Sequence, residues 1–130
     1  MGLATFKGGI HPYEGKELSE NKPIQVLLPK GELVFPMSQH IGAPAKPLVA
    51  KGDRVLAGQK IGEAAGFISA PVHSSVSGTV VAVEPRMHGT RGSEVMAVVI
   101  ESDGKNTLHE SVQPHKALDE LTPDEIIEIV

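Results

Sequence analysis

The fold of this chain is decided by residues 41–85, which read IGAPAKPLVAKGDRVLAGQKIGEAAGFISAPVHSSVSGTVVAVEP. The stretch joins a Gly-Asp-Arg-Val turn at 52–55, a Gly-Gln pair at 58–59 and an Ala-Pro…Ser-Gly-Thr-Val segment at 70–80. Apolar runs of strand length lie between these motifs, rich in Val and Ile and bounded by Gly, Pro, Asp or Ser. The stretch therefore predicts a domain of many short β-strands.

An internal repeat favours one arrangement of these strands. Ile-Gly-Ala-Pro at 41–44 is echoed by Ile-Ser-Ala-Pro at 68–71, and a turn glycine, Gly52 or Gly78, follows each copy. Two halves related by a pseudo-two-fold axis would produce this pattern. Together with the three motifs, the repeat resembles the biotinyl/lipoyl carrier domains, flattened barrels that present a modified lysine on a hairpin. The predicted fold class is all-β, a barrel-sandwich hybrid with an irregular N-terminal arm and a short C-terminal helix.

The lysine that a carrier domain requires is missing. Residues 61–93 contain no lysine, and the predicted hairpin tip at 63–67 reads Glu-Ala-Ala-Gly-Phe. Lys60 falls before this tip, within a predicted strand and not at the exposed, mobile tip where a swinging arm is attached. The domain is therefore predicted to have a structural role and to carry no group attached to a lysine.

The composition excludes several classes of function. The net charge is -4, and the chain has one Tyr, three Phe and no Trp. This composition disfavours a nucleic-acid partner, since nucleic-acid binding uses basic patches and aromatic stacking platforms. The absence of cysteine excludes disulfides and thiolate-bound zinc or iron–sulfur clusters within these residues. No run approaches the ~20 apolar residues of a membrane span, so any role at a membrane is predicted to be peripheral.

Four regions are predicted along the chain. An N-terminal arm of irregular structure covers 1–24, the β domain covers 25–101, a polar linker covers 102–121, and a helix starts within 122–130. The strands of the β domain are expected at 24–28, 33–37, 47–50, 54–56, 59–63, 67–70, 78–83 and 94–101.

The helix start at the C-terminal end carries a clear signal. Thr122 is a favourable N-cap, Pro123 follows at the first helical position, and Glu125 completes a capping box. The chain then stops after about two turns, which is marginal for an isolated helix. We expect that this helix opens a further domain beyond Val130; a small docked terminal helix is the alternative.

Metal binding is the main alternative to a purely structural role. The histidines show no H-x-H or H-E-x-x-H spacing. Some barrel-sandwich proteins place an essential histidine on a late strand, whereas this chain has Glu101 there. A metal-binding or hydrolytic module would have to combine His40, His73 and Glu101. The six histidines are His11, His40, His73, His88, His109 and His115.

Nucleophilic and phosphate-binding chemistry is not indicated. His73 and Ser74 are adjacent on an extended segment and would point to opposite faces. The glycine pairs Gly8-Gly9 and Gly89…Gly92 match no phosphate-binding fingerprint. Arg86 and Arg91 are candidates to contact an anionic ligand, but a solvated charge on a loop is the much commoner role of such residues. The sequence therefore assigns no catalytic, cofactor-binding or metal-binding residue.

Four long motifs resemble the N-terminal region of the RnfC family. They are Phe-Lys-Gly-Gly-Ile-His-Pro at 6–12, Pro-Met-Ser-Gln-His-Ile-Gly-Ala-Pro-Ala-Lys-Pro at 36–47, the Gly-Asp-Arg-Val segment at 52–62 and Ser-Ala-Pro-Val-His-Ser-Ser-Val-Ser-Gly-Thr-Val at 69–80. The similarity covers about residues 6–101 in a fixed order. The NqrA family of sodium-pumping quinone reductases shares less, namely the Gly-Gly start and the Ala-Pro…Ser-Gly-Thr-Val segment.

The resemblance implies a role in an electron-transport complex. RnfC proteins are peripheral subunits at the cytoplasmic face of the bacterial cytoplasmic membrane. Their complex passes electrons between ferredoxin and NAD and couples this transfer to ion transport. The family implies FMN, NADH and two 4Fe-4S clusters for the complete protein, but their binding residues lie outside these motifs. In the family a flavin/NADH-binding domain follows this region, so the resemblance implies that the helix starting at Thr122 leads into such a domain. Because the scaffold is well specified but carries no assembled active site, we hypothesise that this segment is a non-catalytic scaffold that docks the downstream redox domains of its chain or other Rnf subunits.

Overall fold

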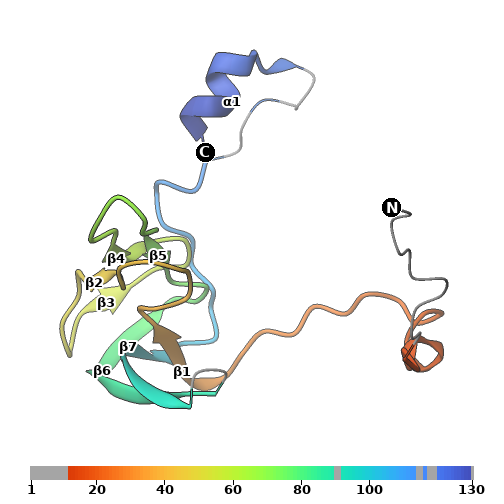
Figure 1. The fold of residues 1–130 in the computed structure, drawn as a ribbon, viewed down its shortest axis with the longest axis horizontal. Helices are drawn as coiled ribbons and strands as arrows, with labels where there is room; N and C mark the ends of the chain where they lie inside the picture. The colour runs from red at the N-terminus through yellow and green to blue at the C-terminus, as the bar shows by residue number, and fades with distance from the viewer. Residues whose placement is uncertain (1–11, 90–91, 114–115, 117–119, 130) are drawn as a thin grey trace, which may run out of the picture.

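Two small antiparallel sheets form the body of the protein (Figure 1). The computed structural model describes residues 12–89, 92–113, 116 and 120–129. The four-stranded sheet has the order β1 (Gly31–Pro36), β7 (Ser93–Ser102), β6 (Gly78–His88) and β3 (Arg54–Val55). The three-stranded sheet has the order β2 (Lys46–Pro47), β4 (Lys60–Glu63) and β5 (Val72–His73). This arrangement confirms the predicted barrel-sandwich hybrid class.

The core is aliphatic, as the shortage of aromatic residues predicts. Val98 and Ile100 lie two residues apart on β7, so their side chains reach the same face, and both are fully buried. Phe35 is the one aromatic side chain in this cluster of described residues. Close packing explains the small residue at Gly62, where an added Cβ would lie 2.8 Å from the Met37 sulfur. The other buried members of the cluster are Ala45, Val55, Ile61, Val72, Val76 and Val80.

The Gly-Asp-Arg-Val motif joins a loop to the start of β6. Gly52 has a φ of 99°, which favours glycine, and its N–H donates to the Val80 carbonyl oxygen at 2.7 Å. The Val80 N–H in turn donates to the Asp53 carbonyl oxygen at 2.8 Å. The Asp53 carboxylate accepts the N–H of Ala50 at 2.8 Å, which closes the turn. The polar groups of this turn are therefore used for folding.

Most of the predicted strands are present, and their ends are shifted. The longest pairing joins β6 and β7 and continues from Gly78↔Ser102 to His88↔Ser93, with a bulge at Val81. β6 thus continues to His88, past the predicted end at Val83. The predicted strand at 47–50 is reduced to the two residues of β2.

Two strand predictions are wrong. Residues 67–70 lie in the loop before β5, because the backbone there bonds to another loop and not to a strand. Residues 24–28 have no strand partner within the described part of the chain, and this apolar segment runs extended away from the two sheets (Figure 1). The described part of the arm also contains a turn of 3-10 helix at Lys16–Leu18.

The capping box of the C-terminal helix is confirmed. Helix α1 spans Pro123–Ile129. The N–H of Thr122 donates to the Glu125 carboxylate at 2.8 Å, and the N–H of Glu125 donates to the Thr122 hydroxyl at 3.3 Å. Lys116 also binds this carboxylate at 2.8 Å, and these donors, Lys116 foremost, lower the pKa of Glu125.

The first half of the segment predicted as a linker is bound to the barrel. We call residues 103–112 the strap. The N–H of Ala57 donates to the Thr107 carbonyl oxygen at 2.9 Å, and the N–H of His109 donates to the Ala57 carbonyl oxygen at 2.8 Å. Val112 lies over Gly58, where an added Cβ would overlap it. The strap therefore adds a parallel bridge, Ala57↔Leu108, to the barrel.

Substitution of Gly78 tests the close approach of β6 to β7. A Cβ at this position would overlap the backbone carbonyl oxygen of Glu101, which has no freedom to move away. We expect Gly78→Ala to lower the free energy of unfolding by at least ~3 kcal/mol in urea denaturation. Gly89→Ala is the control, because no described atom lies within 4 Å of its added Cβ. Equal midpoints for the two variants would contradict this packing.

Candidate functional site

The three residues of the alternative metal-site hypothesis lie on different elements. His73 is on β5 of the three-stranded sheet, opposite Lys60. Glu101 is on β7 of the four-stranded sheet, between Glu32 and Thr79. His40 lies in the loop between β1 and β2. Among the residues that the structure describes, no three His, Asp or Glu side chains are grouped so that they could hold a metal ion.

His40 fastens two loops together. Its Nδ1 lies 2.9 Å from the Ile41 carbonyl oxygen, and its Nε2 lies 3.1 Å from the carbonyl oxygen and 3.2 Å from the backbone nitrogen of Ala70. Both ring nitrogens are therefore engaged with the backbone of the two Ile-x-Ala-Pro copies. These backbone contacts account for His40 without a bound metal ion or other ligand.

The other candidate groups also have structural partners. Ser74 is buried, and its hydroxyl donates to the Val76 carbonyl oxygen at 2.6 Å, while His73 is exposed. The predicted absence of a His73–Ser74 pair is consistent with this geometry. Arg86 forms an ion pair with Glu84 at 2.6 Å. His88 lies at the end of β6, and the His109 Nδ1 lies 2.8 Å from the Ser111 hydroxyl. Five further sequence candidates lie outside the described residues: Gly8, Gly9, His11, Arg91 and His115.

The loop between β4 and β5 occupies the place of a carrier hairpin. We call residues 64–71 the tip loop. It is fixed to the loop before β2, since the Ala43 N–H donates to the Ile68 carbonyl oxygen at 2.9 Å. The Ser69 hydroxyl donates to the Ala43 carbonyl oxygen at 2.8 Å and accepts the Ala65 N–H at 3.1 Å. The two copies of the repeat thus pair with each other, which is the physical basis of their similarity.

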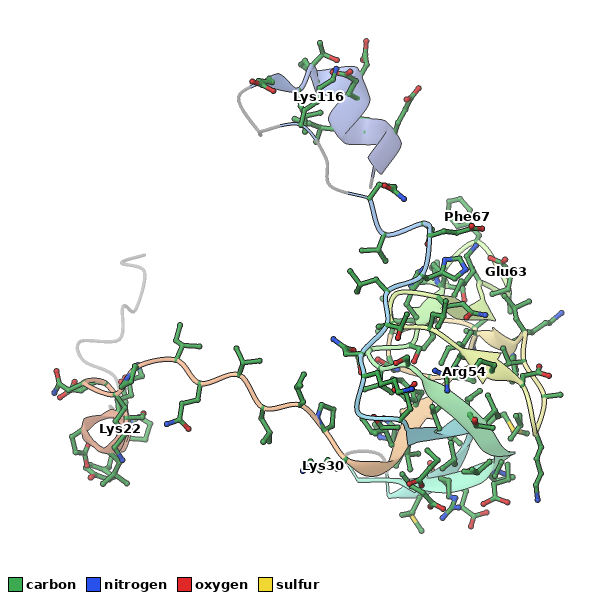
Figure 2. All side chains as sticks on the ribbon, turned by 180° about the vertical axis from the view of Figure 1, so that it is seen from behind. Lys22, Lys30, Arg54, Glu63, Phe67 and Lys116 are labelled. Carbon is green, nitrogen blue, oxygen red and sulfur yellow. The ribbon has the colours of Figure 1, made fainter. Side chains whose placement is uncertain are left out.

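The tip loop presents apolar side chains in place of a lysine. Phe67 is fully exposed, and Figure 2 shows it at the extremity of the domain near Glu63. Ile68 and Ile41 are exposed on the two paired loops. We call these three residues the tip patch. Leaving large apolar side chains in water forgoes ~1.5–3 kcal/mol each, so the tip patch is a candidate contact surface.

The position of the tip could be predicted from the sequence, whereas the tip patch was missed. The absent lysine predicts only that no group is carried, and the composition of residues 67–70 favours a strand over an exposed loop. The available signal was the pair Phe67-Ile68 beside Gly66, because large apolar residues are unusual in an exposed turn. Lys60 lies within β4, where it forms an ion pair with Glu63 at 3.3 Å.

A carboxylate at the start of the strap binds three segments together. Asp103 accepts the Ser77 hydroxyl at 2.7 Å and the Lys105 N–H at 2.9 Å, and it forms an ion pair with Arg54. The Ser77 hydroxyl also accepts the Thr107 N–H at 2.8 Å. The Lys105 N–H first, then the Ser77 hydroxyl and Arg54, lower the pKa of Asp103 to about 2 against a partial desolvation that raises it. The side chain is only 16% exposed, and its partners are all groups of the protein, so the cluster has a structural role.

Comparison with known proteins places this geometry in a family. A family model described as the RnfC barrel sandwich hybrid domain matches residues 4–105. The chain is 49% identical over 126 residues to the C subunit of the Na⁺-translocating ferredoxin:NAD⁺ oxidoreductase complex of Acetobacterium woodii, covering 97% of this chain and 28% of that protein.

Two further relatives extend the comparison. The chain is 38% identical to the C subunit of the proton-translocating ferredoxin:NAD⁺ oxidoreductase complex of Clostridium ljungdahlii, covering 98% of this chain and 28% of that protein. It is 36% identical to the C subunit of an ion-translocating oxidoreductase complex of Vibrio cholerae, covering 98% of this chain and 17% of that protein. The chain thus spans less than a third of the length of these curated relatives.

The stability contributed by Asp103 depends on pH. Its pKa in the folded state, about 2, lies below the ordinary value of 3.8, so the contribution is complete above the ordinary pKa and is lost as the pH falls through the folded-state value. We expect Asp103→Asn to lower the thermal midpoint at neutral pH, with a difference from the parent chain that narrows between pH 3.8 and about 2. Circular dichroism measures both midpoints, with the exposed-site variant Glu94→Gln as control. A difference that stays constant with pH would contradict the assignment.

Metal titration tests the separation of His40, His73 and Glu101. Ligands of one zinc ion must all lie ~2.0–2.2 Å from it, and residues on different sheets and loops that are not grouped do not meet this condition. We expect calorimetric titration of the chain with Zn²⁺ to give the same heats for the parent and for His73→Ala. Saturable binding at micromolar concentration that disappears in His73→Ala would restore the metal-site hypothesis.

Proposed function

The chain belongs to the RnfC barrel-sandwich hybrid family, and on that premise we propose that it is a non-catalytic scaffold domain in the RnfC-type subunit of an ion-translocating ferredoxin:NAD⁺ oxidoreductase complex. The family match and the relatives' names support the complex. One observation carries the docking role: the loop pair that would present a carrier lysine presents Ile41, Phe67 and Ile68 instead.

The rigidity of the tip loop favours docking over transport of a group. A swinging carrier needs a mobile attachment point, whereas Ser69 and His40 bind the two loops to each other. A surface ordered before binding loses little conformational entropy on association. Exposed aromatic side chains at such positions are common centres of binding energy. The tip patch therefore has the physical character of a docking surface.

The partners in this proposal are the redox domains of a longer RnfC-type chain and the neighbouring subunits of the complex. In this proposal the complete protein transfers electrons between ferredoxin and NAD, coupled to ion transport, as a peripheral protein at the cytoplasmic face of the bacterial membrane. Relatives named for Na⁺ and for protons both share this domain, so the domain is suited to either kind of complex. No helix in the described part of the chain has the length and hydrophobicity of a membrane span.

The residues of this chain do not fit the cofactors that the family implies. The chain contains no cysteine, so it cannot supply thiolate ligands to a 4Fe-4S cluster. The described glycines serve turns and strand packing: Gly52 supplies the positive φ of its turn, and Gly78 allows the close approach to Glu101. FMN, NADH and the two clusters are therefore assigned in this proposal to other parts of the complete protein.

A charge at the tip patch tests the docking role. In a tagged RnfC-type protein that contains this domain, Phe67→Asp should reduce co-purification of the other subunits at least ~10-fold, because loss of a central aromatic contact costs ~1.4 kcal/mol or more. The fold should be unaffected, since the side chain is fully exposed. The thermal midpoint of the 130-residue chain checks this.

Met87→Asp is the matched control, because Met87 is also exposed and lies on the β6–β7 ribbon and not on the tip. It should leave co-purification unchanged. Full recovery of the subunits with Phe67→Asp would contradict docking through the tip patch, and so would an equal loss with Met87→Asp.

A further inference from the structure

The arm before β1 contains an apolar segment, residues 24–28, that a spacer does not require. The exposed fractions of Ile24, Val26 and Leu27 are 98%, 89% and 88%. Flexible linkers are rich in Gly and Ser or in charged residues, whereas this segment reads Ile-Gln-Val-Leu-Leu. Contiguous exposed apolar side chains are typical of interaction sites. The segment is therefore a candidate for contact with a partner outside the two sheets.

The charges beside this segment stand at its two ends and have one sign. Lys22 and Lys30 lie just outside the two flanking prolines, and Figure 2 shows them at opposite ends of the extended segment. Both side chains are exposed, and neither belongs to an ion pair within the described part of the chain. Residues 22–30 thus contain two lysines and no acidic residue, although the whole chain has a net charge of -4. A complementary surface is apolar in its middle and carries carboxylates at its two ends.

The extended backbone of the segment favours a protein as its partner. Pro23 and Pro29 flank the segment, and each disfavours a helical conformation at the residue before it. An extended segment in a lipid surface would leave its backbone N–H and C=O groups unsatisfied. A groove in a protein supplies hydrogen-bonding groups together with apolar contacts. A protein groove is therefore favoured over a membrane.

The shortness of the segment favours a partner on the same polypeptide. A stable interface between separate proteins uses ~20–30 residues on each side, and this segment supplies far fewer. It would therefore not hold a second copy or another subunit by itself. A covalently linked domain is kept at a high effective concentration, so a small contact is sufficient. The relatives contain such further domains, because this chain spans only 28% of the length of two of them.

We propose that residues 22–30 dock on the redox domains of a longer RnfC-type chain, in an apolar groove bordered by carboxylates. This inference rests on the proposed function and adds to it a second contact, separate from the tip patch, with a named partner. The family match supports a role for the arm, since it begins at residue 4 and so includes the segment.

Amide hydrogen exchange with detection by mass spectrometry tests this contact. Peptides that cover residues 24–28 are compared between the 130-residue chain and a longer RnfC-type subunit that contains it, purified without the other subunits. These amides should exchange at least ~10-fold more slowly in the longer subunit, because docking excludes them from water. Equal exchange in the two proteins would overturn the proposal, and so would protection that appears only after other subunits are added.

Variants of the longer subunit test the chemistry of the groove. Val26→Asp should remove the protection of residues 24–28, and so should Lys22→Glu combined with Lys30→Glu, because these changes put like or unpaired charges into the contact. Met87→Asp is the matched control, since Met87 is also an exposed apolar residue but lies on β6, and it should retain the protection. The amides of β7 should stay protected in every variant, which shows that the barrel is folded. Full protection in either arm variant would contradict the proposed groove.

The arm contact and the tip patch are measured separately. Co-purification of the other subunits with Phe67→Asp tests the tip patch, whereas amide exchange at residues 24–28 in the isolated longer subunit tests the arm. The proposed function and this contact can therefore fail independently of each other.

Discussion

The pairing of the two Ile-x-Ala-Pro loops is the contact on which the rest of the tip depends. Gly42 has a φ of 86° and approaches so closely that an added Cβ would overlap the Ile68 carbonyl oxygen. This approach lets Ala43 bond to Ile68 and lets Ser69 reach Ala43. Without it the tip loop would be a free hairpin. The glycine thus converts a carrier-type hairpin into a fixed surface.

A second set of contacts fixes the strap to the barrel. Asp103 joins β3 through Arg54, the segment before β6 through Ser77, and the strap through Lys105. A largely buried carboxylate is stable only when its oxygens are satisfied, and here both oxygens have donors. The strap therefore leaves the barrel in a defined direction. A fixed direction is consistent with the proposed scaffold domain, which would hold the redox domains of a longer chain in place.

Features that depend on periodicity and turn chemistry could be predicted from the sequence. The apolar run of β7 and the capping box at Thr122 and Glu125 are local signals, and both appear as expected. The fold class followed from several motifs in order, because each motif fixes a turn. The turn at Gly52 and Asp53 shows this well, since its polar groups bond to nearby backbone.

The remaining features depend on partners far away in the sequence. Residues 67–70 have strand-like composition, but the Ile68 carbonyl oxygen bonds across a loop to Ala43. The strap has the composition of a polar linker, yet Thr107 bonds to Ala57. His40 was a metal candidate because its residue type is a good ligand, whereas its neighbours prove to be backbone groups. Local composition carries no information on such contacts.

The central claim is that the fixed tip of this domain is a contact surface, and solvent labelling of Phe67 tests it most directly. Hydroxyl-radical footprinting compares the same side chain in the free chain and in the assembled complex that contains the domain. We expect strong labelling of Phe67 in the free chain and at least ~10-fold less in the complex, with Met87 labelled in both. Equal labelling of Phe67 in the two states would contradict the claim.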